Sequence, residues 1–137
     1  MYDAIVAGGS ISGLLAAREI AGNGHSVLVL EEGFEVGSPE HCGGLVSRNA
    51  LKELGIEPSQ KTFDDEIKCA KIFSPEGKEI TINSEKQKII VINRRELDKQ
   101  AARQARNNGA DISVKTRFQE KINNGVKTSN GDIECKF

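Results

Sequence analysis

A glycine-rich turn between an apolar run and a helical segment is the feature that most constrains the fold of this chain. Residues 2–7 are mostly apolar and are followed at once by the turn Gly8-Gly9-Ser10-Ile11-Ser12-Gly13. Residues 12–23 then show a helical pattern that Gly24 ends, and residues 26–30 form a second apolar run. Strand, helix and strand within about 30 residues indicate a βαβ unit in a parallel sheet that is covered on both faces.

The turn matches most of the dinucleotide-binding pattern G-x-G-x-x-G. Gly8 allows the tight turn, Gly13 lets the helix approach the strand, and Ser10 stands where the pattern has its second glycine. The start of the following helix offers backbone N–H groups and a partial positive charge to phosphates. We therefore expect a pyrophosphate to bind along Gly8, Gly9, Ser10, Ile11, Ser12 and Gly13.

An acidic residue stands where the pattern requires one, because Glu31 ends the second apolar run. A carboxylate at that place accepts hydrogen bonds from the ribose hydroxyls and repels a 2′-phosphate, which favours FAD or NAD over NADP. We expect Glu32 to border this site as a loop residue. An unoccupied Rossmann-like turn is the alternative, and Ser10 favours it because its side chain takes up room at the pyrophosphate.

The rest of the chain predicts further alternation of helices and strands. We expect connections at residues 33–46 and 56–66 and helices at residues 48–54 and 94–108. Strands are predicted at residues 67–74, 78–84, 88–93 and 111–115, followed by three more at 117–122, 125–128 and 132–136. We expect Cys69 to be a small core residue. The predicted fold is α/β, a Rossmann-like FAD-binding domain over residues 1–137 with a parallel sheet, a crossover helix and an antiparallel β-meander.

Five short segments give the chain a resemblance to a known family. Residues 2–9, 21–24 and 27–31 resemble the N-terminus of FAD-dependent oxidoreductases of the glutathione-reductase-like class. Residues 35–45, EVGSPEHCGGL, are similar to the GxPxxCGEGL stretch of geranylgeranyl reductases, although Gly44 stands where the family has an acidic residue. Residues 94–98, RRELD, are similar to the family's R-x-x-F-D helix.

The resemblance implies a flavin-dependent reductase that saturates isoprenoid chains of lipids. It places Arg94 at the flavin phosphate and ribityl region, and His41, Cys42 and Gly43 beside the flavin ring. There the Cys42 thiol would act in catalysis or be only a structural residue of the loop. Family members continue with a second flavin-binding segment and a substrate domain. We therefore expect the 137 residues to be about the first third of such an enzyme, active only within a longer chain. We also expect an apolar patch where the missing domain would pack, through which the chain self-associates.

Two other functions stay open from the sequence: an FAD-dependent dehydrogenase or monooxygenase of another branch, and a non-catalytic dinucleotide-binding module. Nucleic acid is not an expected partner, because 19 basic and 20 acidic residues give a net charge of −1. No apolar run is long enough to span a bilayer. Two histidines and three scattered cysteines suggest no metal site, and unpaired thiols favour a cytoplasmic location, membrane-peripheral if the substrate is a lipid.

Overall fold

The chain divides into two compact units. The computed structural model describes residues 1–39, 42–83 and 88–136. The first unit combines Met1–Glu40 with Arg95–Phe137, and the second is His41–Arg94. Within the described residues, no helix is both long and apolar enough to cross a membrane.

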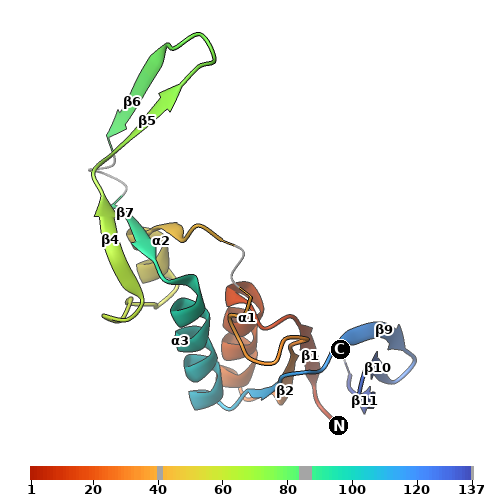
Figure 1. Ribbon diagram of the computed structural model, residues 1–137. Helices are drawn as coiled ribbons and strands as arrows, with labels where there is room; N and C mark the ends of the chain where they lie inside the picture. Colours follow the sequence, from red (N-terminus) through yellow and green to blue (C-terminus); the bar gives the residue numbers. More distant parts are fainter. Residues whose placement is uncertain (40–41, 84–87, 137) are drawn as a thin grey trace. The chain divides into compact units, whose positions relative to one another are not determined.

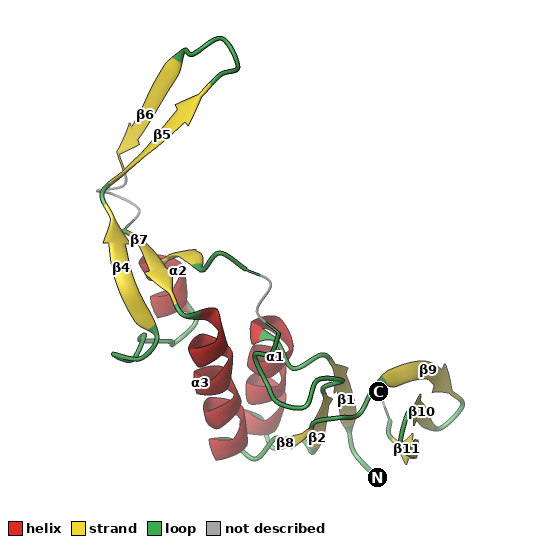
Figure 2. Cartoon of the chain, viewed as in Figure 1, coloured by secondary structure: helices red, strands yellow, loops and turns green. Residues whose placement is uncertain are grey.

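A parallel sheet with strand order β1-β2-β8 forms the centre of the first unit (Figure 1). Helix α1 connects β1 to β2, and α3 leads into β8 (Figure 2). The bounds are β1 Ala4–Ala7, α1 Ile11–Gly22, β2 Val27–Leu30, α3 Arg94–Asn107 and β8 Asp111–Ser113. All four residues of the central strand are buried, which explains its uninterrupted apolar sequence. The predicted parallel sheet and crossover helix are confirmed.

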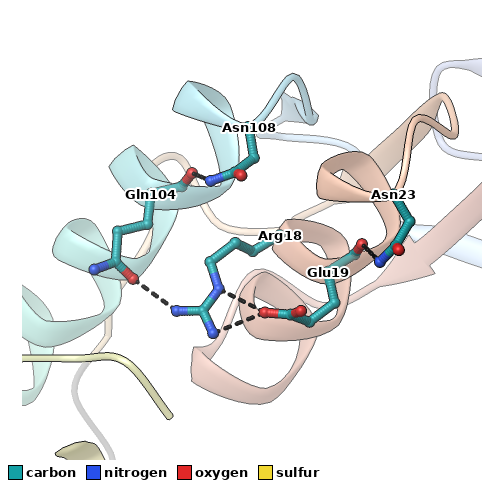
Figure 3. Close-up of polar contacts among 5 residues, drawn as sticks. All are labelled: Arg18, Glu19, Asn23, Gln104 and Asn108. Carbon is teal, nitrogen blue, oxygen red and sulfur yellow. Dashed lines mark hydrogen bonds and ion pairs between the residues drawn. The ribbon is translucent and has the colours of Figure 1, made fainter.

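The core of the first unit depends on small side chains that let both helices lie close to the sheet. Its buried members are mainly Leu14, Ala17 and Ala21 of α1, Val27 and Val29 of β2, and Ala101, Ala102 and Ala105 of α3. At the edge of this core, Arg18 of α1 donates a hydrogen bond to Gln104 of α3 over 3.1 Å and pairs with Glu19 (Figure 3). The side-chain amides of Asn23 and Asn108 end the two helices by donating to carbonyl oxygens four residues earlier.

The predicted meander follows the parallel sheet. Its strands are β9 Phe118–Ile122, β10 Gly125–Thr128 and β11 Gly131–Glu134, in the order β11-β10-β9. Thr116 is buried where the chain passes from β8 into the meander, and its hydroxyl bonds Ser113 and the carbonyl oxygen of Val114. The amide of Asn130 donates to the same hydroxyl over 2.9 Å. This network fixes the start of the meander against the end of the sheet.

The second unit contains an antiparallel sheet of order β3-β7-β4, a short helix and a separate hairpin. The bounds are β3 Leu45–Ser47, α2 Arg48–Glu53, β4 Phe63–Ile67, β5 Cys69–Phe73, β6 Glu79–Asn83 and β7 Ile89–Ile92. The expectation that residues 33–46 are a connection is wrong at its end, where β3 begins at Leu45. The expectation that residues 56–66 are a connection is wrong from Phe63 on, where β4 begins. The central strand β7 buries Ile90 and Ile92 and pairs on both edges, so its neighbours become strands despite their charged or glycine-rich sequences.

The β5–β6 hairpin is exposed along its whole length. Cys69 lies in it, so the expectation that this cysteine belongs to a core is also wrong. The pairs Ala70–Ile82 and Ile72–Ile80 stand opposite one another in its register. Because side chains alternate between the faces of a strand, these four residues share one apolar face.

Candidate dinucleotide site

The glycine turn after β1 brings the start of α1 close to the ends of the strands. The N–H of Gly8 donates to the carbonyl oxygen of Leu30 over 2.8 Å, which joins the turn to the end of β2. Gly8 has φ +106°, a conformation that favours glycine. At Gly13 a β-carbon would lie 2.1 Å from the carbonyl oxygen of Gly8. Only a residue without a side chain therefore allows this approach of helix and turn.

The start of α1 suits an anion. Ser10 takes the N-cap position with extended backbone, and its side chain caps none of the described N–H groups. The first turn of the helix carries no acidic residue. The N–H groups of a first helical turn have no partner within the helix and carry a partial positive charge. A phosphate of a dinucleotide fits this helix terminus. Ser10 departs from the glycine pattern, but its side chain does not bond to the N–H groups that the phosphate would use.

The carboxylate of Glu31 joins the two loops that follow β1 and β2. Its Oε2 accepts the N–H of Gly9 over 2.8 Å, and its Oε1 accepts the N–H of Gly33 over 2.7 Å. A β-carbon on Gly9 would lie 2.9 Å from Oε2, so a side chain there would crowd the carboxylate that accepts this N–H. A carboxylate has about four lone-pair sites, and two are used here. The remaining two leave room for the ribose hydroxyls that the sequence predicts.

The backbone of Glu31 is held as firmly as its side chain. Its N–H donates to the carbonyl oxygen of Ser113, and its carbonyl oxygen accepts the N–H of Thr116, both over 2.9 Å. The segment from β8 to the meander therefore sets where the carboxylate stands. The sequence gives no sign of this support, because the two segments are more than 80 residues apart.

A pocket of about 210 Å³ opens beside the carboxylate at the carboxyl ends of the strands. It is lined by Gly8, Leu30, Glu31, Glu32, Thr116, Arg117 and Phe118. Arg117 Nε lies 3.4 Å from Glu32 Oε2 at its exposed mouth. The volume suits part of a nucleotide. The lining residues from the meander were not predicted, and neither was the Gly33 partner of Glu31, although its place two residues after the acidic residue could have suggested it.

The predicted site residues fall into two groups. The turn Gly8–Gly13 comes together with Glu31 and Glu32 in the first unit. Cys42, Gly43 and Arg94 belong to the second unit, and His41 lies outside the described residues. Cys42 is an exposed free thiol, and Arg94 is the half-buried first residue of α3. Their predicted positions beside a flavin stay predictions.

Comparison with known proteins gives consistent relatives. No protein-family model matches the chain. A digeranylgeranylglycerophospholipid reductase of Methanocella arvoryzae is 36% identical over 135 residues, 96% of this chain and 33% of the relative. The enzyme of the same name from Thermoplasma volcanium is 38% identical over 119 residues, 84% of this chain and 30% of the relative. The chain thus spans about one third of the length of the curated relatives it matches.

Solved structures agree with these relatives. A geranylgeranyl bacteriochlorophyll reductase-like protein of Thermoplasma acidophilum superposes with a TM-score of 0.85 at 34% identity, covering 98% of this chain and 36% of that one. A myxobacterial FAD-dependent chondrochloren halogenase shares the fold with a TM-score of 0.78 at 17% identity, over 98% of this chain and 35% of that chain. By sequence and by fold, the chain is similar to geranylgeranyl reductases along about one third of those proteins' length.

Proposed function

We propose that this chain is the FAD-binding portion of a flavin-dependent reductase that saturates the isoprenoid chains of a lipid. One observation carries the proposal: the glycine turn opens the N-terminus of α1 next to the pocket that Glu31 lines. The names of the relatives support a lipid as the substrate, and the name of the FAD-dependent halogenase supports a flavin as the cofactor. When bound, the flavin supplies the hydride or electron transfer.

The residues of this chain would bind and orient the adenosine diphosphate half of the cofactor. The N–H groups at the start of α1 would hold the pyrophosphate. Glu31, already fixed by two backbone N–H groups, would accept the ribose hydroxyls on its unused lone pairs. Phe118 offers an aromatic wall of the pocket to a flat base.

The flavin half of the site and the lipid site belong to the same proposal. Arg94 would reach the phosphate or ribityl group, while His41, Cys42 and Gly43 would border the flavin ring. The whole reductase would need further segments, because the chain matches only about a third of its relatives. Residues 1–137 would then act together as one FAD-binding domain, in a cytoplasmic protein whose three cysteines are free thiols.

Self-association is part of the proposal and concerns the hairpin. An isolated two-stranded hairpin is only marginally stable in water, and this one exposes the apolar face of Ala70, Ile72, Ile80 and Ile82. We expect this face to pair with that of a second copy. Sedimentation equilibrium should show concentration-dependent dimers that Ile72→Lys abolishes, and a monomer at every concentration would contradict self-association.

A pair of variants at Ser10 tests the cofactor site. Ser10→Asp and Ser10→Asn are both good N-caps of similar size, so they should leave helix stability nearly equal. The aspartate places a negative charge next to the two charges of a pyrophosphate, and each such pair costs about 1 kcal/mol even in water. Ser10→Asp should therefore weaken FAD binding at least ~10-fold relative to Ser10→Asn.

Titration of the chain with FAD, NAD and ADP distinguishes a flavin site from a site for adenine nucleotides alone. FAD binding that is tighter than binding of ADP supports a flavin site, whereas equal binding of FAD, NAD and ADP indicates that this chain recognises only the adenosine diphosphate half. If none of the three nucleotides binds, or if both Ser10 variants bind FAD equally well, the proposed site is wrong. Isoprenoid reduction by a chain carrying the remaining segments, followed by mass spectrometry, separates a reductase from a dehydrogenase or monooxygenase.

A further inference from the structure

A second pocket in the first unit has a chemical character of its own. It has a volume of about 300 Å³ and lies between α3, strand β8 and the loop that follows β2; we call it the α3–β8 pocket. Its apolar walls include Val36, Ala102, Ile112 and Val114. It shares no lining residue with the pocket beside Glu31. It is therefore a pocket distinct from the one beside Glu31.

Three cations border these apolar walls. Lys99, Arg103 and Arg106 follow one another on α3 at spacings of four and three residues, so they share one side of the helix. Lys99 pairs with Glu35 over 3.0 Å. The guanidinium groups of Arg103 and Arg106 are exposed, and neither forms a hydrogen bond or ion pair with any described residue.

The needs of the helix do not account for this charge. Like charges at these spacings destabilise a helix. The dipole favours a cation in the last turn, where Arg106 stands, and Glu35 accounts for Lys99, but neither gives a reason for Arg103. The chain as a whole has a net charge of −1, so the positive charge is local to this surface. An anionic ligand would be a partner for the guanidinium groups of Arg103 and Arg106.

The pocket also offers an exposed aromatic residue. Phe34 lines it with 64% of its surface exposed, so its ring is open to contact with an apolar ligand. Two free arginines suit phosphate oxygens, since a guanidinium binds phosphate through paired N–H donors. Apolar walls and an exposed Phe suit the carbon skeleton next to that phosphate. The combination fits an amphiphile with a phosphate headgroup better than inorganic phosphate, which would need only the cations.

We propose that the α3–β8 pocket binds the phosphate headgroup of an anionic phospholipid at a membrane surface. Arg103 and Arg106 bind the phosphate, Lys99 stays paired with Glu35, the carboxylate of the lining, and Phe34 contacts the apolar part of the lipid. A flat acidic protein surface is the less suitable partner, because it would leave the apolar hollow unfilled. The proposal does not depend on flavin binding and can be tested without it.

Co-sedimentation of the 137-residue chain with vesicles tests the proposal. The vesicles are phosphatidylcholine with and without phosphatidylglycerol, and the parent chain should bind only the anionic ones. Arg103→Gln with Arg106→Gln should weaken this binding roughly 30-fold, because each cation near an anionic surface contributes about fivefold. Lys52→Gln with Lys121→Gln removes the same charge from exposed positions outside the pocket and should leave binding nearly unchanged.

Other outcomes overturn the proposal. It is wrong if the arginine double variant, folded by circular dichroism, binds anionic vesicles as well as the parent chain does. It is also wrong if the charge-matched control loses as much binding, or if Phe34→Ser has no effect. Arginine-dependent binding of inorganic phosphate as tight as vesicle binding would identify a free-phosphate site. Arginine-dependent retention on poly-glutamate beads, without vesicle binding, would identify an acidic protein partner.

Discussion

Replacement of Glu31 should destabilise the protein in the absence of any cofactor. The carboxylate accepts two backbone N–H groups, from Gly9 over 2.8 Å and from Gly33 over 2.7 Å. Hydrogen bonds to a charged group contribute about 1.5 kcal/mol each at this half-buried position, so Glu31→Ala should cost about 3 kcal/mol. Glu31→Gln keeps one acceptor but turns an amide NH₂ toward the other N–H donor, and should cost about 2 kcal/mol.

Urea unfolding followed by circular dichroism measures this cost, and thermal unfolding should show a fall of about 7 °C in Tm for Glu31→Gln. The neighbouring carboxylate provides the control. Glu32 is 68% exposed and lies 3.4 Å from an exposed Arg117, so Glu32→Gln should change the free energy of unfolding by no more than about 0.5 kcal/mol. If Glu31→Gln is as stable as the parent chain, or if Glu32→Gln costs as much, the carboxylate does not hold the two loops.

Three further predictions follow from other contacts. Gly13→Ala should cost about 3 kcal/mol or more in urea unfolding, because its β-carbon would lie 2.1 Å from a carbonyl oxygen; Gly43→Ala, which meets nothing within 4 Å, should be nearly neutral. Thr116→Val keeps the shape of a buried side chain but removes a hydroxyl bonded to Ser113, Val114 and Asn130, and should cost about 2 kcal/mol by the same measurement. The hydrogen bond from Lys99 holds the pKa of Glu35 below its usual range. The contact between Glu35 and Lys99 therefore stabilises the fold at pH values above the pKa of a glutamate in the unfolded chain, about 4.3. This stabilisation is lost as the pH falls through the lower pKa of Glu35 in the folded chain. Glu35→Gln should remove that part of the acid dependence of stability between about pH 5 and 3, and an unchanged pH profile would contradict it.

The first unit could be predicted from sequence because its signals are local. The apolar run of β2, the turn with Gly8 and Gly13, and the glycines that end the helices each act within a few residues of their position. The same holds for the meander, whose strands are separated by turns at Gly125 and Gly131 with positive φ. Local propensity and tertiary packing agree in these elements, so sequence patterns gave the correct order.

The elements that were missed depend on contacts made at a distance. Residues 63–67, Phe-Asp-Asp-Glu-Ile, have a poor strand composition, yet they pair with β7 because that buried strand needs a neighbour on both edges. A strand-type run that contains Cys69 predicts a small core residue, but the hairpin exposes both of its faces. The pocket beside Glu31 combines the ends of two strands with a segment some 85 residues further on, which no local pattern relates.

Glu31 shows why a residue in a matching motif does not by itself reveal its function. The motif predicts a ribose ligand, while the contacts show a carboxylate that joins two loops, and both roles are met by the same two oxygens. Loss of cofactor binding in a Glu31 variant would therefore follow from either role. Ser10 separates them, because aspartate and asparagine cap a helix about equally and differ in charge. A lower FAD affinity of the aspartate variant, with equal stability of the two variants, reports the negative charge of the ligand, so the test of the cofactor site belongs at the residue that departs from the glycine pattern.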